Sequence, residues 1–192
     1  MNKEFEKRRR RLAKLIGKDG IAVIPTASTR VRSRDTDYPY RPDSDFYYFT
    51  GFSEPHAVMI LAPGREDGAF VVCLRDKNPL TEIWDGHMEG LNGVKKNFGV
   101  DQSFKIEDLE TILSSLFLGR QKVFFTLGQD DVLDKTLMRS YNAVRAGQRR
   151  GGVVPSEIQA LEPLIHEMRL IKSKKEISLM RKSAKISVDA HK

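Results

Sequence analysis

The sequence has one cysteine, one tryptophan and no long hydrophobic run in its 192 residues. A single cysteine, Cys73, excludes an internal disulfide or a thiolate cluster, so we expect a small buried side chain in a reducing compartment. The absence of a run of roughly 18 apolar residues argues against a membrane-spanning helix, and we expect no membrane partner. Residues 1–11 are charged and no apolar signal region follows them, so we expect a cytoplasmic protein.

Catalytic motifs are also missing. The histidines lack metal-ligand spacing, and His166-Glu167 begins an H-E-x-x-H zinc motif that fails at Leu170. The sequence contains neither a phosphate-binding glycine loop with a lysine nor a Gly-x-Ser-x-Gly nucleophile elbow. The residues alone therefore do not indicate a self-sufficient enzyme.

The net charge of +7 raises the possibility of a nucleic-acid partner. The positive charge gathers in residues 7–11 and 172–192, two segments with helical patterns in which basic side chains form a solvated face. No aromatic residue interleaves with either basic run, as a stacking platform for single-stranded nucleic acid requires. We therefore expect no nucleic-acid partner.

The apolar pattern predicts one domain with an α/β fold. Aromatic and β-branched runs predict strands over residues 21–24, 46–50, 57–61, 69–74 and 123–126, with a short edge strand over 81–84. Helical spacing predicts helices over residues 3–16, 106–118 and 130–145. Residues 26–37 read as a loop, and residues 87–99 as a loop or irregular helix. This alternation favours a mixed β-sheet flanked by helices on both faces.

The end of the chain predicts one more helix. Ser173 and Glu176 form a Ser-x-x-Glu capping box, which is typical of a helix start. No glycine or proline follows up to Lys192, and one face of this helix is apolar: Ile177, Met180, Ala184 and Val188. We expect residues 1–172 to form a first domain and residues 173–192 to begin a linker helix into a second domain.

Three phrases of the sequence resemble a known family. They are YPYRPDSDFYYFTGFSEP over residues 38–55, EIWDG over residues 82–86, and IHEMRLIKS over residues 165–173 followed by Glu176-Ile177. In this order they are similar to the amino-terminal domain of the Xaa-Pro aminopeptidases (aminopeptidase P), in the creatinase and prolidase superfamily. The resemblance covers essentially the whole chain and implies the α/β fold of the creatinase and aminopeptidase P N-terminal domain.

The resemblance implies that the chemistry lies beyond this chain. In the family, a second, pita-bread domain holds two divalent ions, usually manganese, on two aspartates, a histidine and two glutamates. The whole enzyme removes the N-terminal residue from peptides whose second residue is proline. The first domain makes the contacts of a homo-oligomer, a dimer or tetramer, and restricts access to the active site. The 192-residue chain by itself is then expected to be inactive.

Three residues match family positions at the substrate pocket and its access across subunits. Trp84 resembles a tryptophan that reaches into a neighbouring subunit's active site, where an indole can cover a proline ring. Asp35 and Arg149 resemble an acidic and a basic partner near the entrance, where such a pair can fix a loop bidentately. Without the resemblance, Trp84 also fits a partly buried core position, and Asp35 and Arg149 fit solvated loop charges.

Two alternatives to the aminopeptidase remain open. One is a metal-free peptide- or protein-binding module of the same superfamily, of the chaperone-like kind, because the chain lacks a catalytic constellation and has basic ends. The other is prolidase, which cleaves dipeptides. Metal-dependent cleavage of longer Xaa-Pro peptides by the full-length protein distinguishes the aminopeptidase from both.

Overall fold

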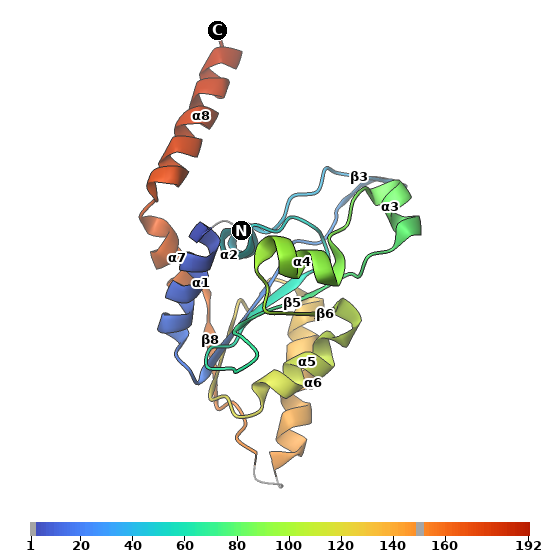
Figure 1. Ribbon diagram of the computed structural model, residues 1–192, viewed down its shortest axis with the longest axis vertical. Helices are drawn as coiled ribbons and strands as arrows, with labels where there is room; N and C mark the ends of the chain where they lie inside the picture. Colours follow the sequence, from blue (N-terminus) through green and yellow to red (C-terminus); the bar gives the residue numbers. More distant parts are fainter. Residues whose placement is uncertain (1–2, 149–151) are drawn as a thin grey trace. The chain divides into compact units, whose positions relative to one another are not determined.

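The structure is a computed structural model that describes residues 3–148 and 152–192. The chain forms two compact units: unit 1 ends at Leu161, and unit 2 runs from Glu162 to Lys192. Unit 1 contains a six-stranded sheet and a separate two-stranded hairpin (Figure 1).

The six strands form one mixed sheet in the order β6-β5-β4-β1-β7-β8. β4 is antiparallel to its neighbours β1 and β5, whereas β5–β6, β1–β7 and β7–β8 are parallel pairs. Five strands therefore run in one direction, and their last residues meet at one edge, which we call the carboxyl edge. The strands are β1 (Gly20–Pro25), β4 (Val58–Leu61), β5 (Phe70–Leu74), β6 (Gln102–Lys105), β7 (Lys122–Phe125) and β8 (Glu157–Ala160).

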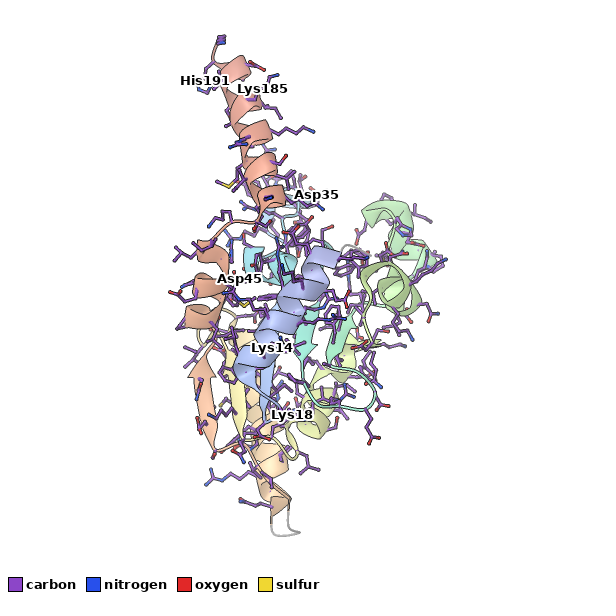
Figure 2. The ribbon with its side chains drawn as sticks, turned by 60° about the vertical axis from the view of Figure 1, so that its left-hand side comes forward. Lys14, Lys18, Asp35, Asp45, Lys185 and His191 are labelled. Atoms are coloured by element: carbon purple, nitrogen blue, oxygen red, sulfur yellow. The ribbon has the colours of Figure 1, made fainter. Side chains whose placement is uncertain are left out.

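Helices of unit 1 cover both faces of the sheet, which confirms the predicted architecture. On one face, α5 (Leu109–Phe117) and α6 (Asp131–Ala146) bury Leu113 and Leu137 against strand residues such as Cys73. The other face is covered by α1 (Lys3–Ile16) and α2 (Ser44–Thr50). Figure 2 shows α1 in front of the strands. Every residue of the central strands β1, β4 and β5 is buried, as a sheet covered on both faces requires.

The prediction of a strand over residues 46–50 is wrong, because this segment is helix α2. The Asp43 carboxylate accepts hydrogen bonds from the backbone N–H groups of Asp45 and Phe46, at 2.8 and 2.9 Å, and so caps the helix. Gly51 ends the helix in a left-handed conformation with a φ of 69°. Phe46 and Phe49 lie one turn apart and are both fully buried. The aromatic run is thus the buried stripe of a short helix.

The predicted edge strand over residues 81–84 is also wrong, because these residues belong to helix α3 (Pro79–Asp85). The side chain of Asn78 caps the helix by accepting a hydrogen bond from the backbone N–H of Leu80 at 3.0 Å. Pro79 occupies the first helical position, where its missing N–H breaks no hydrogen bond. The Asn-Pro pair was therefore the sequence signal for a helix start.

Several elements lie where the sequence predicted none. The segment predicted as a loop at residues 26–37 contains the hairpin of β2 (Val31–Ser33) and β3 (Thr36–Asp37).

Other segments match the predictions in part or were not predicted. Residues 87–99 were predicted as a loop or an irregular helix, and the helix is right, because α4 spans Gly90–Phe98. The edge strands β6 and β8 were missed because both are largely half-buried or exposed and lack an apolar run. The predicted helix over residues 106–118 begins with a 3-10 turn, η1 (Ile106–Asp108), before α5.

Unit 2 consists of helices α7 (Glu162–Leu170) and α8 (Lys174–Ala190). The predicted capping box is confirmed, since the Ser173 hydroxyl accepts a hydrogen bond from the Glu176 N–H at 3.2 Å and Glu176 accepts one from the Ser173 N–H at 2.7 Å. Among the described helices, none combines the length and apolar character needed to cross a lipid bilayer.

Candidate functional site

Two of the three predicted site residues lie in segments that leave the carboxyl edge of the sheet. β1 ends at Pro25 and leads into the β2–β3 hairpin, which carries Asp35. β5 ends at Leu74 and leads into α3, which carries Trp84. Because β1 and β5 run in the same direction, both segments start from the same edge, and Figure 1 shows them toward the same end of unit 1. Ligands of open α/β sheets bind at this edge.

Asp35 lies in the turn between β2 and β3, next to Arg34, which has a left-handed φ of 44°. All residues of both strands are exposed, and so is Asp35 (Figure 2). With the residues that the structure describes, Asp35 forms no hydrogen bond or ion pair. Its carboxylate is thus accessible to a partner outside this chain.

Trp84 is 88% exposed, so the interpretation as a partly buried core residue is excluded. Leu80 and Ile83 of the same helix are each 73% exposed. An indole with neighbouring aliphatic side chains forms an apolar surface that suits contact with another apolar group. The geometry thus allows Trp84 to contact a partner molecule.

Helix α3 is held by polar contacts, most of which involve Glu82. The Glu82 carboxylate accepts a hydrogen bond of 2.9 Å from the Met88 N–H, lies 3.1 Å from the Lys77 ammonium and lies 3.6 Å from Nδ1 of His87. The hydrogen bond from Met88, together with Lys77, lowers the pKa of Glu82 below its usual range. Sequence reasoning missed this residue because the spacing of Glu82 and Met88 matches no capping or periodic pattern.

Arg149 lies outside the described residues. The helix before it, α6, starts at the carboxyl edge after β7 and ends at Ala146, and β8 begins at Glu157. Since β8 is parallel to β7, α6 ends toward the opposite edge of the sheet from Asp35 (Figure 1). The structure thus brings Asp35 and Trp84 to one edge and leaves the predicted partnership with Arg149 untested.

A cleft of about 600 Å³ also lies at the carboxyl edge, between the end of β1 and the first turns of α5 and α6. Its charged groups are mostly engaged: Arg139 pairs with Glu110 at 2.7 Å, and Asp130 caps α6 through the N–H groups of Val132 and Leu133. Its lining comes from distant parts of the sequence, which is why no local motif indicated it. The remaining charged or titratable lining residues are His56, Arg75 and Glu107.

Burial shifts the pKa of the Cys73 thiol and that of the His56 imidazole, both in unit 1. Cys73 is fully buried, as predicted, and burial raises its pKa to about 12. Burial and the charge of Arg75 lower the pKa of His56, which favours a neutral imidazole. Within residues 3–148 and 152–192, no three His, Cys, Asp or Glu side chains come together in a way that could hold a metal ion. The described residues therefore do not fit a metal site.

Comparison with known proteins identifies the fold. A family model described as the N-terminal domain of aminopeptidase P matches residues 5–125. The Xaa-Pro aminopeptidase of Escherichia coli (strain K12) is 33% identical over 189 residues, which cover 98% of this chain and 43% of that protein. The structure of Pseudomonas aeruginosa aminopeptidase PepP matches with a TM-score of 0.95 and 41% identity, over 98% of this chain and 43% of that one.

A further solved relative is the Zn-substituted E. coli aminopeptidase P in complex with product, with a TM-score of 0.93 and 32% identity over 100% of this chain and 44% of that one. The fold and these matches define the class: a mixed α/β domain of the kind found in Xaa-Pro aminopeptidases. The chain belongs to the aminopeptidase P N-terminal domain family, which confirms the resemblance. It spans less than half the length of these relatives.

Proposed function

We propose that this chain is the non-catalytic N-terminal domain of a metal-dependent Xaa-Pro aminopeptidase. The whole enzyme removes the N-terminal residue that precedes proline in a peptide. The observation that carries the proposal is the similarity to the E. coli Xaa-Pro aminopeptidase, which is 33% identical and spans 98% of this chain.

The catalytic part of the protein is proposed to follow this chain. Residues 1–172 are the N-terminal domain in this proposal, and residues 173–192 begin the linker helix into the catalytic domain. Two divalent ions, which we propose to be manganese, would be held in that second domain. The Zn-substituted relative supports a divalent-metal enzyme. The 192-residue chain alone is expected to be folded and inactive.

The proposed role of this domain is to form subunit contacts and restrict access to the active site of a homodimer or homotetramer. The exposed Trp84 supports this role, because it presents a large apolar side chain without cover from its own helix. We propose that its indole lines the substrate pocket of a neighbouring subunit, where it packs against the substrate's proline ring.

Asp35 and Arg149 are proposed to tether the pocket entrance between subunits. The accessible carboxylate of Asp35 supports this role. We propose that the two side chains pair between two subunits. Asp35→Asn and Arg149→Gln should then weaken oligomerisation of the full-length protein on a sizing column to the same degree, without additive loss in the double variant.

The proposed compartment is the cytoplasm, which is reducing and suits the buried free thiol of Cys73. A relative from Arabidopsis thaliana is named a mitochondrial intermediate cleaving peptidase, so another compartment is the alternative. Fluorescence imaging of the tagged full-length protein in its native cell tests the assignment.

The test of function uses the full-length protein with added manganese. We expect it to release the first residue from Xaa-Pro peptides longer than two residues, and the 192-residue chain to release none. Cleavage of Xaa-Pro dipeptides alone would indicate prolidase. Salt-sensitive binding of an acidic protein without any hydrolysis would indicate the metal-free binding module.

A further inference from the structure

The segment that carries Trp84 leaves the body of unit 1 and returns to the same place. The chain before α3, which includes Lys77, is here the outgoing leg, and the chain after α3, up to Gly90, is the returning leg. The two legs meet where Gly90 lies against Lys77: a Cβ added at Gly90 would be 2.9 Å from the Cβ of Lys77 and 3.1 Å from its backbone nitrogen. Gly90 also has a left-handed φ of 62°, which favours glycine. The returning leg is anchored by the buried side chain of Met88 and by the Glu89 N–H, which donates to Glu54 at 2.8 Å.

Helix α3 lies between these legs and has little apolar packing of its own. Each of its seven residues is exposed or half-buried. A helix of this length is marginal in water without tertiary contacts, because few hydrogen bonds offset the cost of ordering it. Its orientation must therefore come from its two ends and from polar contacts.

The Glu82 carboxylate makes contacts with both legs. It contacts Lys77 on the outgoing leg and the Met88 N–H on the returning leg, and His87 lies nearby. Only a fifth of the Glu82 side chain is exposed, and the N–H that it binds at 2.9 Å belongs to the buried Met88. The pair of Arg75 with Asp85 is longer at 3.4 Å, and its carboxylate is half-exposed. Glu82 thus connects the middle of α3 to both points where the segment is anchored.

We propose that Glu82 is the positioning residue for Trp84: its carboxylate holds α3 to both legs and so fixes the direction of the indole. The inference rests on the proposed role of Trp84 in a substrate pocket. An indole held in one direction loses less conformational freedom when it meets a substrate, which favours binding. Glu82 itself does not contact the substrate in this proposal.

The test measures the fluorescence anisotropy of the 192-residue chain, in which Trp84 is the single tryptophan. In Glu82→Ala we expect the anisotropy to fall to about half, because an indole that moves within nanoseconds depolarises its emission. Glu82→Gln keeps an oxygen acceptor for the Met88 N–H and should recover part of the loss. The control, Glu157→Gln, removes a carboxylate that lies 3.5 Å from Lys122 on the sheet and should match the parent.

Thermal unfolding separates positioning from general stability. Because α3 adds little to the core, the unfolding midpoint of Glu82→Ala should stay within about 2 °C of the parent. Unchanged anisotropy in Glu82→Ala would overturn the proposal. So would a larger fall in the midpoint, which would make Glu82 a general stability residue.

Kinetics of the full-length protein connect the inference to function. Glu82→Ala should raise KM for an Xaa-Pro peptide about fivefold with a smaller change in kcat, and should add nothing to Trp84→Ala. Additive losses in the double variant would contradict the positioning role. If Trp84→Ala alone left the kinetics unchanged, the proposed role of Trp84 would fail, while the anisotropy would still decide what Glu82 does.

Discussion

The guanidinium of Arg9 donates a hydrogen bond of 2.7 Å to the backbone carbonyl of Phe49 and lies 3.9 Å from the ring centre of Phe70. Arg8 donates to the preceding carbonyl, that of Tyr48, at 3.0 Å. Two neighbouring arginines of α1 thus bind the C-terminal carbonyls of α2, where the helix dipole favours positive charge. Burial lowers the pKa of Arg9 to about 10, so it remains charged at neutral pH. This contact connects the first helix, α2 and the sheet.

Arg9→Met should lower the free energy of unfolding by about 2–3 kcal/mol, because it leaves the buried Phe49 carbonyl without a charged donor. Urea unfolding at pH 7, followed by circular dichroism, measures the change. Arg10→Met is the matched control, since Arg10 is exposed and its ion pair with Glu6 belongs to the helix surface. Its expected cost is at most about 0.5 kcal/mol. Equal losses in the two variants would refute the role given to Arg9.

Trp84→Ala should change the free energy of unfolding by less than about 0.5 kcal/mol, because the side chain is 88% exposed. In the full-length protein it should lower kcat/KM for Xaa-Pro peptides about tenfold, since the proposed substrate pocket would lose an apolar wall worth roughly 1.4 kcal/mol in the transition state. Trp84→Phe keeps a flat ring and should retain most of the activity. Equal kinetics for the parent and both variants would remove Trp84 from the site.

Acid should loosen Trp84 through Glu82. The folded-state pKa of Glu82 is lowered by the Met88 N–H and Lys77, so its contacts are present above the ordinary glutamate pKa and are lost as pH falls through the lower, folded value. Trp84 anisotropy should therefore stay constant from pH 7 down to the ordinary glutamate pKa of 4.5 and fall below it. In Glu82→Gln the fall should be absent.

Glu54 serves as the contrast in this titration, because burial raises its pKa. It protonates at higher pH than Glu82, and its neutral carboxyl can still accept the hydrogen bond from Glu89. A fall in anisotropy that began above the ordinary glutamate pKa, or that persisted in Glu82→Gln, would assign the effect to Glu54 instead.

Cys73 should resist thiol reagents while the protein is folded. Its pKa of about 12 lowers the thiolate fraction about a thousandfold relative to its ordinary value of 9.0, and its full burial also blocks access. Labelling by a coloured disulfide reagent at pH 8 should be complete within seconds in concentrated urea and slower by at least about a thousandfold without it. Rapid labelling of the folded chain would show that the sheet opens around β5.

The sequence predicted the buried elements best. β1, β4, β5 and β7 are short apolar runs that the sheet buries, and α6 has the predicted apolar spacing and an Asp130 cap. The strand prediction for residues 46–50 failed because an unbroken aromatic run has neither a helical nor a strand period. Only the cap at Asp43 and the stop at Gly51 distinguish a helix from a strand here. The edge strand β8 was not predicted, because its residues are mostly exposed and so have no apolar pattern.

The sequence analysis named single candidate residues but did not predict how the residues of the candidate site are arranged in space. The phrase around Trp84 made the tryptophan a candidate, but its exposure depends on the α3 segment lying away from the core, which no local pattern predicts. The contacts of Glu82 also depend on the return of the chain at Gly90, where a close approach to Lys77 requires glycine. The cleft at the carboxyl edge combines residues as distant as Thr26 and Arg139, so it emerges only from the fold.

The most direct test of the account is a hydrolysis assay on the full-length protein with two peptides that differ at one position, Xaa-Pro-Yaa and Xaa-Ala-Yaa. With manganese present, we expect release of the first residue from the proline peptide and not from the alanine peptide, and loss of activity after treatment with a chelator. A protein that is folded and loaded with manganese but cleaves neither peptide would contradict the assignment of this chain to an Xaa-Pro aminopeptidase.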